Sequence, residues 1–221
     1  ALLAMTADHI AVICRPVPGF RAFGDLAFPL FAFLLVEGFF HTRDRRRYGR
    51  RLLLAAAVSE IPYDLAFSGQ WMDAQHQNVC LTLFLALVAM ELLERYGNGI
   101  WEKLVLTAVF CTLTEAAGAD GGAWGMGLVL AFYFCVIGNS GTNVPRSILF
   151  HEKTAGVFMK MIAAVLIGAF VWQEPLWVLA LTAVCLLLYD GSKGRSRFRS
   201  FFYIYYPAHL LVLYFVGKWL G

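Results

Sequence analysis

The chain has 221 residues, of which 60% are hydrophobic and only 15% are charged, and its formal net charge is +3. A soluble domain usually carries about 25% charged residues to cover its surface. The composition therefore excludes a disordered chain, a disulfide-built secreted domain and a typical soluble enzyme, and it disfavours a nucleic-acid-binding protein with a basic groove. The mean hydropathy of +0.65 indicates an integral membrane protein.

Nine apolar segments follow one another along the chain. Their length and their lack of apolar/polar alternation favour helices over barrel strands. The predicted helices cover residues 1–14, 24–41, 51–67, 78–94, 100–116, 123–139, 155–172, 175–189 and 200–217. The first is shorter than the roughly 20 residues that cross a bilayer, so we expect the sequence to begin part-way into a first helix. The connections are short, which predicts one all-α domain over residues 1–221, a single bundle of about nine transmembrane helices.

The basic residues predict the orientation of this bundle, because cytoplasmic loops collect Lys and Arg. When alternate connections are grouped together, 15 of the 18 Lys and Arg residues fall in one group. We therefore expect that group to be cytoplasmic, with the N-terminus inside and the C-terminus outside. The arginine run 43–51 then lies on the cytoplasmic side, and the loop 71–75 lies on the outer side.

Ionisable residues inside apolar segments are candidate functional groups, because burying them in a membrane is unfavourable unless they are partnered. Asp8 and His9 form the sharpest such feature. A carboxylate can fix the tautomer of an imidazole and leave its other nitrogen free as a general base. Neighbours in a helix do not face each other, however, so the partner of His9 is expected on another helix. Asp8 can instead pair with Arg21.

Glu37 and His41 are spaced i, i+4, so they share a helix face and can hydrogen-bond to each other. The same spacing suits two ligands of a divalent metal, but a third ligand is missing and we expect no metal. The five cysteines are scattered and form no metal-binding pair. The run that follows His41 has two interpretations that do not exclude each other: it fixes the membrane orientation, and it binds phosphate, since Arg binds phosphate in a bidentate manner. Its members are Thr42, Arg43, Arg45, Arg46 and Arg47.

Further polar residues lie around the third and fourth segments. Glu60 and Asp64 are also i, i+4, with Pro62 between them, and we expect one of these acids to be protonated or paired with an arginine. Asn78 or its neighbour Gln77 can cap the fourth helix. His76 has no such structural role and is a second candidate base. His209 is a single histidine among aromatic residues, which is typical of a satisfied core residue.

These residues together resemble the TraX family of bacterial membrane proteins. The resemblance is carried by FPLFAFLLVEGFFHTRDRRRYGRRLLLAAAVSEIPYDLAF, by HQNVCLTL, by the Asp8-His9-Ile10 start and by GADGGAWG. Gly121 departs from the family pattern, where a tyrosine is expected after Asp120. The motif positions carried over are Asp8, His9, Phe28, Pro29, Glu37, Gly38, His41, Thr42, Arg43, Arg51, Glu60, Pro62, Asp64, His76, Asn78 and Asp120.

The resemblance implies an acyltransferase in the bacterial inner membrane, since the founding member is associated with N-acetylation of conjugative pilin. The donor is expected to be acetyl-CoA or another acyl-CoA, with its phosphates near Arg43, Arg45, Arg46 and Arg47. The acceptor is expected to be an amine or hydroxyl of a peptide, glycan or lipid. His9 is the first candidate base and His76 the second, while Asn78 or Arg21 is expected to stabilise the oxyanion. The alternative is a small proton-coupled transporter that uses the same buried acids and histidines.

Overall fold

The computed structural model describes residues 1–14, 20–138, 176–189 and 201–220. These residues are helical apart from their connections, which confirms the all-α class. The helices are α1 (Leu2–Ile13), α2 (Phe20–Gly24), α3 (Ala27–His41), α4 (Arg45–Phe67), α5 (Val79–Tyr96), α6 (Ile100–Ala116), α7 (Gly122–Gly138), α9 (Leu176–Leu188) and α10 (Phe201–Leu220). The predicted helix over 155–172 lies outside the described residues, and the short helix α2 was not predicted.

Local capping explains where the helices begin. Asn78 precedes α5, and its side-chain oxygen accepts a hydrogen bond from the backbone N–H of Cys80 at 3.0 Å, which confirms the predicted cap. Asp44 caps α4 in the same way, accepting from the backbone N–H of Arg47 at 2.8 Å. The predicted helix over 51–67 therefore begins too late, because the Asp44 cap starts α4 at Arg45, inside the arginine run.

The helices do not match the spans that the membrane prediction requires. Within the described ranges, no helix is both long enough and apolar enough to span a bilayer, in contrast to the nine predicted crossings.

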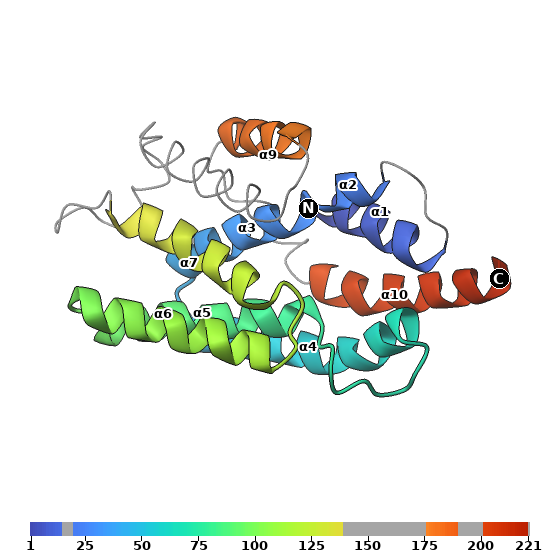
Figure 1. Cartoon of the computed structure of the whole chain (residues 1–221), viewed down its shortest axis with the longest axis horizontal. Helices are drawn as coiled ribbons and strands as arrows, with labels where there is room; N and C mark the ends of the chain where they lie inside the picture. The colour runs from blue at the N-terminus through green and yellow to red at the C-terminus, as the bar shows by residue number, and fades with distance from the viewer. Residues whose placement is uncertain (15–19, 139–175, 190–200, 221) are drawn as a thin grey trace.

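Two groups of buried side chains hold the helices together. The larger group joins α3, α5, α6 and α7 around Phe39, Met90 and Phe132, which are fully buried. The smaller group joins α1, α4 and α10 with the first residues of α3 and α5, around Cys80, Tyr206 and Leu210. Figure 1 shows α10 lying along the second half of α4, with α1 and α2 beside it. The candidate site lies in the smaller group.

A short backbone pairing fixes the two connections nearest this site. The N–H of Gln77 donates to the carbonyl of Gly118, and the N–H of Asp120 donates to the carbonyl of Gln77, both at 2.8 Å. These bonds form an isolated parallel bridge between Gln77 and Ala119. The connection before α5 and the connection before α7 are thereby held side by side.

Candidate active site

A pair of histidines lies between α1 and α10. His9 and His209 are each only 7% exposed, and Nδ1 of His9 lies 2.7 Å from Nε2 of His209. The two rings are nearly parallel, at 7°. The partner of His9 thus comes from another helix, as expected, but it is the histidine that the sequence placed in the core without a role.

The hydrogen bonds of this pair determine where its protons are. Nδ1 of His209 lies 3.0 Å from the backbone carbonyl oxygen of Tyr205, and a carbonyl can only accept, so this Nδ1 carries a proton. In neutral His209 the other nitrogen, Nε2, therefore holds a lone pair. Nδ1 of His9 faces that lone pair and must donate to it. The remaining nitrogen, Nε2 of His9, is left unprotonated and can accept a proton.

Aromatic rings enclose the pair. Phe67, the last residue of α4, meets the His9 ring edge-on with centroids 5.3 Å apart. The ring of Tyr206 is tilted toward both histidines, at 6.3 Å from His9 and 5.6 Å from His209. Such an apolar enclosure excludes water and strengthens the hydrogen bonds inside it. His209 therefore holds His9 in one tautomer, as the third member of a catalytic triad does for its base.

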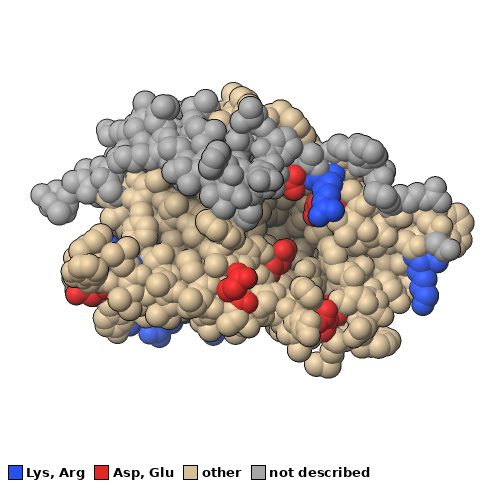
Figure 2. Space-filling view, in the orientation of Figure 1, with Lys and Arg blue, Asp and Glu red and all other residues tan. Residues whose placement is uncertain are grey.

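Acidic side chains gather beside the pair. Asp8 lies within electrostatic reach of Asp25 and Asp120, and also of Arg21. It packs directly against Gly24 of α2, where a larger residue would collide with it. Figure 2 shows Asp and Glu side chains at the edges of a hollow near the middle of this face, with a basic side chain next to them. The predicted Asp8–Arg21 ion pair does not form within ion-pair distance among the described residues.

Asp120 is positioned by its backbone. Besides the bond to Gln77, its carbonyl accepts from the hydroxyl of Thr82 at 2.5 Å. Its side chain is exposed, yet the protein around it desolvates the carboxylate and raises its pKa, while the N–H of Gly121 opposes this shift. The Thr82 and Gln77 contacts fix Asp120 in the connection before α7, where Gly121 replaces the expected tyrosine.

Gly118 allows this placement of Asp120, and replacing it is expected to destabilise the protein. Its φ of +62° suits glycine, and a Cβ there would collide with the backbone carbonyl of Gln75. We expect Gly118→Ala to lower the free energy of unfolding by about 1–3 kcal/mol in chemical denaturation. Gly69→Ala is the matched control, because Gly69 has a φ of +67° but nothing within 4 Å of its Cβ position. An equal loss in both variants would contradict the contact with Gln75.

Glu60 and Asp64 accept hydrogen bonds from neighbouring groups, and among the described residues no arginine lies within ion-pair distance of either acid, which leaves protonation of one of them as the remaining alternative. The backbone N–H of Asp73 donates to Asp64 at 2.9 Å. The Asn78 amide donates to Glu60 and also to the carbonyl of Ala56, the latter at 2.9 Å. Because both of its N–H groups are engaged and its oxygen caps α5, Asn78 has no donor left for an oxyanion. The expected oxyanion role of Asn78 therefore disagrees with this geometry.

His76 differs from His9 in its surroundings. Its side chain is 69% exposed, and its Nδ1 lies 3.1 Å from a carboxylate oxygen of Asp73. Hydrogen bonds from Ser68, Gln75 and His76 lower the pKa of Asp73 to about 2. The connection before α5 thus uses His76 to hold a surface carboxylate. It does not join the histidine pair.

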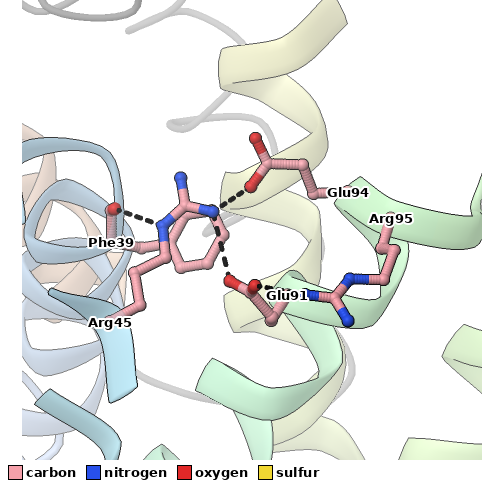
Figure 3. A network of polar contacts seen from close by, with 5 residues as sticks. All are labelled: Phe39, Arg45, Glu91, Glu94 and Arg95. Carbon is pink, nitrogen blue, oxygen red and sulfur yellow. Dashed lines mark hydrogen bonds and ion pairs between the residues drawn. The ribbon is translucent and has the colours of Figure 1, made fainter. Parts of the chain in front are cut away.

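The arginine run lies at the other end of α4. Figure 3 shows Arg45 turned inward, with its guanidinium over the Phe39 ring at 3.8 Å and directed toward Glu91 and Glu94 of α5. Its Nε also donates to the carbonyl of Phe39 at 3.3 Å. Arg45 therefore ties α4 to α3 and α5 through its Nε and one terminal nitrogen, and its contact with the phosphates of the donor stays a prediction. The side chains of Arg43, Arg46 and Arg47 are exposed.

The length of α4 separates this run from the histidine pair. At 1.5 Å per residue, the 23 residues of α4 span about 33 Å from Arg45 to Phe67, which contacts His9. Glu37 and His41 also lie at the arginine end, at the last turn of α3, and Thr42 ends that helix in an extended conformation. Nδ1 of His41 lies 3.0 Å from the backbone carbonyl of Glu37. The structure therefore divides the predicted site residues between two ends of the bundle.

Sequence reasoning missed two residues of the site, His209 and Tyr206. The available signal was the segment YIYYPAHLL, where a histidine and three tyrosines share a helix that contains Pro207. Of the residues that the structure describes, no three His, Cys, Asp or Glu side chains are grouped so that they could hold a metal.

The fold and the site define a helical protein that encloses a proton-accepting pair of histidines. Comparison of the sequence with models of known families shows that the chain belongs to the TraX protein family, whose model matches residues 1–217. The chain is also 29% identical to the probable fimbrial assembly protein FimC, serogroup H1, of Dichelobacter nodosus. That match covers 96% of this chain and 91% of the relative. No solved structure matches the chain.

Proposed function

We propose that this protein is an acyltransferase of fimbrial or pilus assembly, which moves an acetyl or other acyl group from acyl-CoA to an amine or hydroxyl. The observation that carries the proposal is the unprotonated Nε2 of His9, held in its tautomer by His209. Family membership and the likeness to a probable fimbrial assembly protein support the setting. A proton acceptor of this kind is what attack on a thioester by an amine or hydroxyl requires.

The proposed reaction begins at Nε2 of His9. Nε2 of His9 takes the proton of the acceptor as its nitrogen or oxygen forms a bond to the thioester carbon. The π electrons of the thioester carbonyl move onto its oxygen and form a tetrahedral intermediate. When they re-form the C=O bond, the C–S bond breaks and the thiolate of CoA leaves. The imidazolium of His9 then gives its proton to the departing thiolate, which restores the neutral pair and releases CoA. His209 stays neutral throughout and orients the ring, with its own Nδ1–H on the Tyr205 carbonyl.

The acidic hollow suits a cationic acceptor. Asp25 and Asp120 each lie within electrostatic reach of Asp8, the chain neighbour of His9, and Arg21 is the basic residue within the same reach. Carboxylates attract an ammonium group and disfavour a second anion. An amine therefore approaches this site more readily than an acidic acceptor does.

The exposed arginines of the run attract the acyl-CoA donor electrostatically without contacting it at the histidine pair. Arg46 and Arg47 lie about 30 Å along α4 from Phe67, and Arg43 precedes that helix, so all three are too far from the histidine pair to belong to the same contact. A cationic surface still raises the local concentration of a polyanion such as CoA, an effect that salt weakens. We therefore assign these arginines to attracting the donor and to contacts with anionic lipid.

We also propose that the protein acts at the bacterial inner membrane, with the arginine run on the cytoplasmic side. Support comes from the mean hydropathy of +0.65 and from the large apolar side chains exposed on the helices, among them Leu54, Trp101 and Trp219. Washing cell membranes with alkaline carbonate tests this location, because a peripheral protein is released and an inserted one is retained.

The proposal predicts that the purified full-length chain consumes acetyl-CoA when it is given a pilin or fimbrial subunit with a free amine. Release of the CoA thiol measures turnover, and mass spectrometry of the subunit locates the added acetyl group. A subunit whose amines are already blocked is the matched control and is expected to give no thiol release. Absence of turnover with every acyl-CoA and every acceptor tested would contradict the enzyme.

A further inference from the structure

Two side-chain contacts join α1 to α10 near the candidate site, and one of them does not involve the histidines. Oγ1 of Thr6 lies 2.7 Å from the hydroxyl oxygen of Tyr205. About one helical turn further along both helices, His9 meets His209. Because the two contacts follow one another in the same direction, the first one determines how α10 is shifted and turned against α1 where the histidines meet.

A second contact of Thr6 gives the direction of its hydrogen bond with Tyr205. Oγ1 of Thr6 also lies 2.9 Å from the backbone carbonyl oxygen of Leu2, and a carbonyl can only accept, so the hydroxyl proton of Thr6 is used there. The hydroxyl of Tyr205 must therefore donate to Oγ1 of Thr6. Since both hydroxyl protons have acceptors, this bond fixes the Tyr205 side chain against α1 in one arrangement.

Tyr205 is connected to His209 in two ways. Its backbone carbonyl accepts from Nδ1 of His209 at 3.0 Å, and its ring stacks on the His209 ring with centroids 5.0 Å apart and planes at 7°. The His209 ring is in turn parallel to that of His9 within 7°, with centroids 5.0 Å apart. A displacement of Tyr205 would therefore displace His209, and with it the acceptor for Nδ1 of His9.

Pro207 is the reason that this turn of α10 needs support from another helix. It lies between Tyr205 and His209 inside α10. Proline has no backbone N–H and its ring collides with the preceding turn, so it removes one hydrogen bond of the helix and bends it. The helix by itself therefore holds Tyr205 and His209 less firmly in their relative orientation than an unbroken helix would.

We propose that Tyr205 and Thr6 are positioning residues of the histidine pair. Their hydrogen bond fixes α10 on α1 so that Nδ1 of His9 donates to His209 and Nε2 of His9 stays unprotonated. The expected effect on turnover rests on the proposed acyltransferase function. The effect on the tautomer of His9 is a property of the folded protein and can be measured without the reaction.

Tyr205→Phe tests the hydroxyl alone, because the stacked ring and the backbone carbonyl remain. We expect kcat to fall at least about 10-fold, since a slightly misplaced base is far less effective, with KM for the acyl-CoA within about 3-fold of its original value. Tyr214→Phe is the matched control. It removes a hydroxyl from the same helix at a residue whose ring lies 5.7 Å from Nζ of Lys218, and it is expected to leave kcat unchanged.

Substitutions of Thr6 test the same bond from α1. Thr6→Val keeps the shape of the side chain but removes the acceptor, and it should reproduce the loss of kcat. Thr6→Ser keeps the hydroxyl and should restore most of the wild-type kcat, which a role in packing alone would not explain. The double variant with Tyr205→Phe and Thr6→Val should lose no more than either single variant, because both remove one shared bond.

Nuclear magnetic resonance of protein with isotope-labelled histidine ring nitrogens reads the tautomer directly, because protonated and unprotonated ring nitrogens give separate signals. Spectra of His9→Asn and His209→Gln assign the signals of the pair. For His9 in the wild type we expect a protonated Nδ1 and an unprotonated Nε2. In Tyr205→Phe and in Thr6→Val we expect a mixture of both tautomers, and in Thr6→Ser the wild-type spectrum.

The outcomes separate the positioning role from the enzyme. The wild-type tautomer of His9 in both Tyr205→Phe and Thr6→Val overturns the positioning role, whatever their kcat, and leaves the enzyme in place if the wild type turns over. Mixed tautomers in these variants support the positioning role, even if a wild type without turnover contradicts the acyltransferase. If Tyr205→Phe fails to fold, Thr6→Val is compared with Thr6→Ser, and identical spectra overturn the role.

Discussion

His9→Asn is expected to reduce turnover about 10²–10⁴-fold, the usual contribution of a general base. The amide nitrogen of asparagine occupies the position of Nδ1 and can still donate to Nε2 of His209, which lies 2.7 Å from it in the native protein. Only the proton-accepting Nε2 is then lost. Acyl transfer measured by thiol release should therefore fall, while the thermal midpoint stays close to that of the wild type.

Substitutions of the other histidines complete this test. His209→Ala removes the group that orients His9, so we expect at least about a 10-fold loss of turnover. His209→Gln places an amide oxygen where Nε2 was and should restore much of that loss, which a purely structural role would not explain. His76→Ala changes an exposed side chain and should retain most of the turnover. If His76→Ala abolishes turnover and His9→Asn does not, the base is His76.

Arg45→Gln is expected to destabilise the fold by about 2–3 kcal/mol, because it removes charge-assisted bonds from partly buried partners. Arg45 is 24% exposed and directed toward Glu91 and Glu94, and its loss leaves these two carboxylates close together without their shared cation. The Phe39 carbonyl and ring lose a contact as well. Chemical denaturation of the purified protein measures the change in the free energy of unfolding.

Arg46→Gln provides the control, since Arg46 is the adjacent residue of the run and its side chain is exposed. We expect its stability to remain within about 0.5 kcal/mol of the wild type, as is usual for surface substitutions. Binding of acyl-CoA should weaken in Arg46→Gln, more at low salt than at high salt. A stable Arg45→Gln variant that loses only acyl-CoA affinity would favour the phosphate clamp predicted from the sequence.

Much of the helical framework could be predicted from the sequence, because its determinants are local. The predicted helix over 100–116 coincides with α6, and the predicted helix over 123–139 differs from α7 by one residue at each end. The Asn78 cap was also predictable, since a cap needs only a polar side chain and an N–H two residues later. The start of α4 was missed because Asp44 lies inside a run that was interpreted by its charge alone.

The candidate site was less predictable, because its parts are distant in sequence. His9 was identified from its neighbour Asp8, yet its partner His209 is 200 positions away. Nothing local distinguishes His209 from a core histidine, or Tyr206 from the tyrosines beside it. The partners of Arg45 and Asn78 could not be predicted for the same reason, since Glu91, Glu94 and Glu60 engage their donors only after α4 and α5 pack together.

The sequence by itself determined the helical class, most helix boundaries and His9 as a candidate base, because apolar runs, caps and ionisable residues act over a few neighbouring positions. Only the tertiary structure decided which donors and acceptors are already paired and which remain free. Packing of α10 against α1 and α4 selects the tautomer of His9, and packing of α4 against α3 and α5 turns Arg45 inward. The physical reason is that hydrogen bonds and ion pairs saturate: each donor taken by a distant partner is no longer available for a ligand.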